Sequence, residues 1–228
     1  DLGGTLPYGY TAHPKVDARS GELHAASYLW SRPDVIDYSV VSPDGVVVRR
    51  EDVPVPGSPM VHDMSITERY AVFYDLPVVF DMESAMAGAR LPYVWSNDYG
   101  ARVGVLPRDG EGTEGLRWFE VDPCYVFHAA NAYDDITDSS GRVVVDVCRY
   151  DRVFDQDRYG VADSTPTLER WTIDPTAGTV ARQEIDGRGH EFPRIDPRRL
   201  GSEHRYAYTT AFETDTSSGV QLGGVFQH

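Results

Sequence analysis

The sequence predicts an all-β protein. Short runs rich in β-branched and aromatic residues alternate with turn sequences along the whole chain of 228 residues. Only one stretch, 82–89, favours a helix, and it is short with Gly88 near its end. The spacing of strands and turns is typical of propeller blades or of a β-sandwich, and blades set around an axis leave fewer open sheet edges.

The predicted strands follow one another from end to end. They cover 23–30, 35–41, 46–53, 70–75, 102–106, 116–121, 125–130, 142–149, 169–173, 180–185 and 205–210. Turns are predicted at 43–45, 107–110, 139–141 and 174–178 from their Gly, Pro, Asp and Ser content, and 155–166 is predicted to be a loop. No linker divides the chain. We therefore expect a single domain over 1–228, the central portion of a longer protein.

Charge and cysteine content restrict the class of partner. A formal net charge of −15, with Lys15 the only lysine, would repel a nucleic-acid backbone, so no nucleic-acid partner is expected. Cys124 and Cys148 lie in apolar runs, and we expect two buried free thiols. Free thiols favour a reducing compartment, which predicts a cytoplasmic location.

Three histidines lie in apolar, β-prone sequence, each in a different predicted strand region: His13, His62 and His128. The gaps between them are too long for one helix or one zinc knuckle, and suit a repeat of one four-stranded blade, about 40–50 residues. The residues therefore predict a metal site assembled from different strands, although a single histidine in a strand is more often a hydrogen-bonded structural residue.

Other polar residues could likewise support the metal site or have only a structural role. Glu191, between His190 and Phe192, is the best candidate to accept the remote ring N–H of a metal-binding histidine, and it could equally be an exposed strand-end glutamate. Asp63 is a weaker candidate because turns use aspartate freely. The remaining histidines are expected at the surface or in structural roles, namely His24, His190, His204 and His228.

Four motifs carry a resemblance to a known family. Residues 6–17 (LPYGYTAHPKVD), 61–70 (VHDMSITERY) and 127–135 (FHAANAYDD) resemble the first three histidine motifs of the carotenoid cleavage oxygenases. Residues 191–195 (EFPRI) resemble a glutamate motif of the same family. The motifs occur in the family's order and span nearly the whole chain.

The resemblance implies a seven-bladed β-propeller that holds a non-haem Fe²⁺ on its axis with four histidines. His13, His62 and His128 would be three of these ligands, and Glu191 would orient His128. The family's fourth histidine motif and its other two glutamates have no counterpart in this sequence. We therefore expect this stretch alone to be a poor enzyme.

The activity implied by the resemblance is oxidative cleavage of a conjugated C=C bond by O₂. The substrate would be a carotenoid, an apocarotenoid or a stilbene-type alkene, and the products two carbonyl compounds. Phe127 and Phe192 would line an apolar path to the metal, or be ordinary core residues. Peripheral contact with a membrane is expected only through parts outside this chain.

Two alternatives remain open on the sequence. A retinoid-type isomerase would use the same iron site without consuming O₂. A non-catalytic propeller would bind a protein partner and would not need histidines on its axis. The motifs of several other enzyme classes do not occur in the sequence, among them GxSxG, HExxH and GxGxxG.

Overall fold

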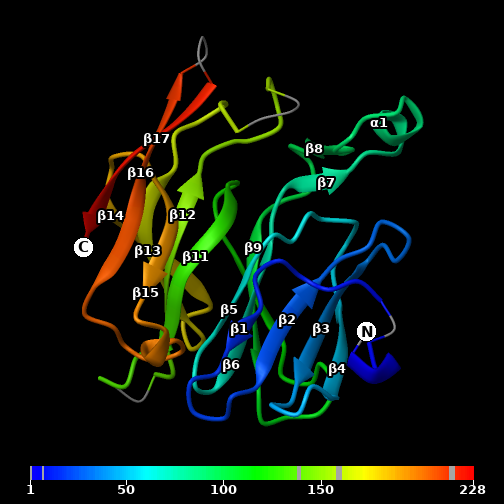
Figure 1. Ribbon diagram of the computed structural model, residues 1–228, viewed down its shortest axis with the longest axis vertical. Coiled ribbons are helices and arrows are strands. Elements are labelled where there is room, and N and C mark those ends of the chain that lie inside the picture. Colours follow the sequence, from blue (N-terminus) through cyan, green and yellow to red (C-terminus); the bar gives the residue numbers. More distant parts are fainter. Residues whose placement is uncertain (1, 7, 138–139, 158–160, 216–218) are drawn as a thin grey trace.

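The computed structural model describes residues 2–6, 8–137, 140–157, 161–215 and 219–228. Antiparallel sheets follow one another along the chain, as predicted (Figure 1). The first sheet contains β1 (Lys15–Val16), β2 (Leu23–Ser27), β3 (Val35–Val41) and β4 (Val47–Pro54). The second contains β5 (Met64–Ile66), β6 (Tyr70–Asp75), β9 (Arg102–Pro107) and β10 (Arg117–Glu120).

Two further sheets complete the series. The third contains β11 (Tyr125–Asp134), β12 (Val143–Tyr150), β13 (Thr167–Asp174) and β14 (Thr179–Asp186). The fourth contains β15 (His190–Ile195), β16 (Ala207–Asp215) and β17 (Gly219–Gln227). In each of these sheets, every strand pairs with the next strand of the same sheet along the chain. This is the up-and-down order of a propeller blade.

The first strands of these sheets lie against one another. β1 contacts β5, β5 contacts β11, and β11 contacts β15. In Figure 1 β1, β5 and β11 lie near the middle of the view. Residues placed on the first strands are therefore brought together although they are far apart in sequence.

Large apolar side chains fill the space between neighbouring sheets. Between the first and second sheets, Tyr38 and Phe73 meet with their ring centroids 5.4 Å apart. Tyr74 of the second sheet lies 6.4 Å from Trp171 of the third, and both side chains are buried. Truncation of such a residue to alanine typically costs about 3–5 kcal/mol, so this packing fixes how the sheets are placed.

An insertion separates β6 from β9. It consists of β7 (Val78–Phe80), α1 (Met82–Met86) and β8 (Tyr93–Trp95), which form a hairpin-like arm at the side of the molecule (Figure 1). The predicted helix is present but shorter than 82–89. Asp81 caps it by accepting a hydrogen bond from the Ser84 N–H at 2.9 Å, and Gly88 follows with φ of +83°.

Every predicted strand is present, most with shifted ends, but several observed strands were not predicted. The predicted strand 23–30 ends at Ser27, and the one at 205–210 begins at Ala207 and continues to Asp215. The short strands β1, β5, β7 and β8 were not predicted because two or three residues carry too little periodicity. The longer strands β15 and β17 were not predicted either; Pro193 interrupts the first, and Gly219, Gly223 and Gly224 weaken the signal of the second. The described parts of the predicted loop 155–166 contain neither helix nor strand. Residue 139 of one predicted turn and Pro7 of the first motif lie outside the described residues.

Cys124 and Cys148 are both buried free thiols, as expected. Burial raises the pKa of the Cys124 thiol to about 12, so it is not a reactive thiolate. Within the described ranges, no helix has both the length and the apolar character needed to cross a membrane.

Candidate metal centre

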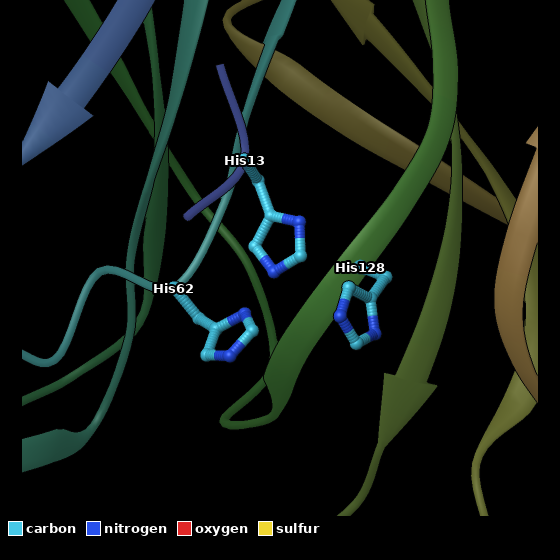
Figure 2. Close-up of side chains that lie close together, drawn as sticks. All are labelled: His13, His62 and His128. Atoms are coloured by element: carbon cyan, nitrogen blue, oxygen red, sulfur yellow. The ribbon is translucent and has the colours of Figure 1, made fainter. Parts of the chain in front are cut away.

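His13, His62 and His128, hereafter the central triad, converge in the structure (Figure 2). The ring centroids lie 4.7 Å apart for His13 and His62, 4.8 Å for His13 and His128, and 5.0 Å for His62 and His128. One ring nitrogen from each lies within 4.8 Å of those of the other two. Three imidazoles that are distant in sequence are thus close enough to share one metal ion.

Each histidine of the triad is held at the beginning of a different sheet. His13 precedes Pro14 and the first strand β1, and proline restricts the preceding residue to extended conformations. His62 lies two residues before β5, and His128 lies within β11. Because these first strands contact one another, the fold itself brings the imidazoles together.

The remote nitrogens of two triad rings are occupied. His128 Nδ1 lies 2.6 Å from Glu191 Oε2, and both side chains are buried. His62 Nδ1 donates to the Phe127 carbonyl oxygen at 3.0 Å. These bonds leave Nε2 of both rings available to a metal, the arrangement that metal-binding histidines commonly show.

A β-bulge in β15 places Glu191 next to the ring of His128. The pairing of β15 with β16 shifts register between Glu191 and Arg194, and Phe192 adopts φ of +53°, which is uncommon for a residue other than glycine. The Phe192 N–H donates to Glu191 Oε2 at 2.6 Å, and the ring of Phe192 lies 5.2 Å from that of His128. The bulge therefore fixes both the carboxylate and an aromatic ring beside the same histidine.

The electrostatics of the triad favour neutral imidazoles. Burial lowers the pKa of His13 to about 4, with Asp63 opposing this effect and the neighbouring His128 and His62 adding to it. Burial also lowers the pKa of His62, helped by the charge of His128. Both rings are therefore neutral near pH 7, the form that binds a metal.

Asp63 joins the three triad segments. Lys15, two residues after His13, places Nζ 2.7 Å from Asp63 Oδ1 and 3.0 Å from Oδ2. Ala129, which follows His128, donates its N–H to Asp63 Oδ2 at 3.0 Å, and the Met64 N–H donates to Oδ1 at 2.7 Å. The sequence had ranked Asp63 as a weak candidate, yet its buried carboxylate is the common partner of all three segments.

The two aromatic residues predicted to line the site differ in their surroundings. Phe127 packs among Tyr125, Tyr150 and Phe154, with ring centroids 4.7, 5.3 and 6.0 Å away, and its edge meets His62 at 5.2 Å. Phe192 is 41% exposed beside His128. Phe192 is thus the more accessible of the two, while Phe127 also belongs to the core; a role in binding substrate stays a prediction for both.

The other histidines lie outside the triad. His24 is buried, where Nδ1 lies 2.8 Å from the Tyr38 hydroxyl and Nε2 lies 3.0 Å from Arg108 Nη2. His204 lies between Asn131 and Asp146, at 3.1 and 3.4 Å. His190 is fully buried and forms a second cluster with Asp186 and His228. His24 and His204 are thus hydrogen-bonded structural residues, as expected. The sequence did not predict that His190 and His228 would cluster with Asp186.

The donor set of the central triad fits a divalent transition metal. Neutral nitrogen donors from three separate segments converge, and two of their remote nitrogens are already bonded. Among the residues that the structure describes, no carboxylate joins these three nitrogens within ligand distance. A metal bound here would keep its full charge, which favours the carboxylates Glu191 and Asp63 behind the ligands.

Comparison with solved structures identifies the class of fold. A lignostilbene dioxygenase of Pseudomonas brassicacearum matches with a TM-score of 0.80 and 30% identity over 93% of this chain and 46% of its own. A cobalt-substituted Synechocystis apocarotenoid oxygenase matches with a TM-score of 0.80 and 27% identity over 100% of this chain and 50% of its own. The predicted fold class, part of a β-propeller, is thereby confirmed.

Sequence comparison then identifies the family. The profile described as retinal pigment epithelial membrane protein matches residues 1–228. A carotenoid cleavage oxygenase of Mycobacterium tuberculosis is 42% identical over 93% of this chain and 50% of its own length. The chain therefore belongs to the family of retinal pigment epithelial membrane protein, which includes the carotenoid cleavage oxygenases. The resemblance seen in its four motifs is confirmed. The chain spans about half the length of these relatives.

Proposed function

We propose that the protein containing this chain is a non-haem Fe²⁺ dioxygenase. It would cleave a conjugated C=C bond of a carotenoid, apocarotenoid or stilbene-type alkene with O₂, giving two carbonyl products. The convergence of His13, His62 and His128 from three sheets is the observation that carries this proposal. The names of the related carotenoid and lignostilbene enzymes support the class of reaction.

The residues of the chain would divide the work as follows. His13, His62 and His128 would hold the metal through neutral ring nitrogens, and Glu191 would fix the orientation of His128. Bound Fe²⁺ with open positions would supply activation of O₂ next to the alkene. Phe192, exposed beside His128, would orient the apolar substrate and keep water from the ring of that ligand.

The proposal is tested with the full-length protein. Purified protein reconstituted with Fe²⁺ is mixed with an apocarotenal or a hydroxystilbene under ¹⁸O₂, and the carbonyl products are trapped rapidly before they exchange oxygen with water. We expect one O₂ consumed for each alkene cleaved and label in both products. Label in one product only would indicate a monooxygenase, and a rearranged alkene without O₂ uptake would indicate the isomerase.

Two related expectations belong to the same proposal. An intact protein that binds no iron would instead support the non-catalytic binding module. The buried free thiols Cys124 and Cys148 support a cytoplasmic location, which cell fractionation of the native host would test.

A further inference from the structure

A second group of potential metal ligands lies where the third and fourth sheets meet. Asp186 ends β14, His190 begins β15, and His228 directly follows β17. One donor atom from each lies within 4.8 Å of the other two. We call these three residues the outer cluster.

The hydrogen bonds of the outer cluster leave one nitrogen of each ring facing the carboxylate. The Thr209 hydroxyl of β16 lies 2.8 Å from His190 Nδ1 and 3.0 Å from His228 Nε2. The opposite nitrogens lie near Asp186, with His190 Nε2 3.1 Å from Oδ1 and His228 Nδ1 3.8 Å from Oδ2. A single hydroxyl thus orients both imidazoles toward one carboxylate.

The His190 nitrogen that faces Asp186 is poorly satisfied. Its side chain is 0% exposed, and Nε2 is buried without a hydrogen bond of acceptable geometry, despite the short separation from Asp186. A buried polar atom that lacks a well-aligned hydrogen bond costs up to about 1–3 kcal/mol, so the poor geometry of this contact calls for an explanation. A ligand at this position would satisfy it.

We propose that Asp186, His190 and His228 form a second metal site, which binds Zn²⁺ with its fourth position left to water. Two nitrogens and one carboxylate oxygen are a known three-ligand set for Zn²⁺. Donors about 2.0–2.2 Å from one tetrahedral ion lie about 3.3–3.6 Å from each other. The two nitrogens lie 3.1 and 3.8 Å from different oxygens of Asp186, so small side-chain movements would bring the donors around one ion. The bound ion would join the ends of β14, β15 and β17, and so connect two neighbouring blades.

Arg188 competes with a metal ion for the carboxylate of Asp186. Its Nε lies 3.0 and 3.1 Å from the two carboxylate oxygens of Asp186, and its guanidinium lies 3.9 Å from the centre of the Phe226 ring. The side chain is 61% exposed and can therefore move away at modest cost. A metal site predicts that removing Arg188 strengthens Zn²⁺ binding, whereas a purely hydrogen-bonded cluster predicts no such effect.

The test uses the full-length protein with iron already bound at the centre. Zn²⁺ is titrated by calorimetry, and the iron and zinc contents are measured after desalting. We expect one equivalent of Zn²⁺ to bind without loss of iron and to raise the thermal midpoint. His190→Gln and His228→Gln should each weaken this binding at least about tenfold, as expected for loss of a ligand. Arg188→Gln should strengthen it about two- to fivefold.

A matched control comes from another buried imidazole beside a carboxylate. His204→Gln removes a ring that lies 3.4 Å from Asp146, outside the outer cluster, and should leave Zn²⁺ affinity unchanged. Because His190 is fully buried, its variant is compared with His228→Gln by circular dichroism and by thermal unfolding without zinc. The proposal is overturned if no extra equivalent binds, if zinc only replaces iron, or if binding persists in both folded histidine variants.

Discussion

The central triad and the outer cluster each bring three donor residues together, but they differ in where the carboxylates lie. In the central triad Glu191 and Asp63 lie behind the ligand segments, and within the described part of the chain the clustered donors are all imidazoles. In the outer cluster the carboxylate of Asp186 is itself among the donors, and the uncharged Thr209 stands behind the rings.

This difference changes the charge that a bound metal would keep. A metal held only by neutral nitrogens would retain its full charge at the central triad. In the outer cluster the carboxylate of Asp186 would neutralise part of that charge. The two groups also differ in origin, because the central donors come from three sheets and the outer ones from two adjacent sheets.

The largest effect is expected from removing a central ligand. His62→Ala in the full-length protein should reduce iron content and turnover by about 100-fold or more, beyond the usual cost of losing a residue behind a ligand. Iron analysis and O₂ uptake measure this loss. His204→Gln is the control and should retain both; a fully active, iron-loaded His62→Ala protein would remove His62 from the site.

The next largest effect should come from Glu191→Gln. The amide keeps the shape of the side chain but loses the charge that holds His128 Nδ1 at 2.6 Å, so turnover or iron retention should fall about 10–100-fold with the fold intact. Glu203→Gln changes an exposed glutamate and should have no effect. Unchanged kinetics in Glu191→Gln would show that His128 needs no carboxylate behind it.

Asp63→Asn should affect stability as well as the metal. The amide can replace only one of the carboxylate oxygens that meet Lys15, Met64 and Ala129, and Lys15 would lose its ion-pair partner. We expect a loss of about 2–3 kcal/mol in the free energy of unfolding, measured with urea, and about tenfold weaker iron binding. The zinc site should not respond.

A suitable control for Asp63→Asn is Asp52→Asn. Asp52 also pairs with arginine side chains, but its own side chain is 53% exposed, so its loss should cost under about 1 kcal/mol. Equal stability losses in the two variants would contradict the role given to Asp63.

The smallest effect on the central site is expected from Thr209→Val. The substitution keeps the side-chain shape and removes the hydroxyl shared by His190 and His228, so zinc should bind about tenfold more weakly. Iron content and turnover should stay at the unmodified level. A parallel loss of iron would mean that the two sites are coupled, and the separation drawn between them would be wrong.

Much of the fold is readable from the sequence because its long strands carry a strong local signal. The predicted strand 142–149 nearly coincides with β12, Val143–Tyr150, which begins with three consecutive valines. The triad histidines were predictable from their apolar context and from the family motifs. The strands β1 and β5 beside two of them were not, since two or three residues form a strand only when neighbouring strands supply the hydrogen bonds.

The remaining polar partners depend on contacts that have no local signal. Asp63 resembles any aspartate before a turn, and its importance arises from Lys15 and Ala129, which the fold brings to it. The outer cluster needs the pairing of β15, β16 and β17, which aligns His190, Thr209 and His228 across the fourth sheet. Sequence spacing alone could not connect these residues.

The bonds of Asp63 also impose an order on biosynthesis. Its partners lie 48 residues before it and 66 residues after it, so the set cannot be complete until Ala129 has been synthesised. At about 5–20 residues per second, that delay is about 3–13 seconds after Asp63 itself is made. During this interval the nascent chain has His13 and His62 but not the strand that aligns them with His128. The three histidines could therefore hold a metal together only after β11, the first strand of the third sheet, has been made. A ribosome stalled before that point would display a chain that lacks one of the three imidazoles.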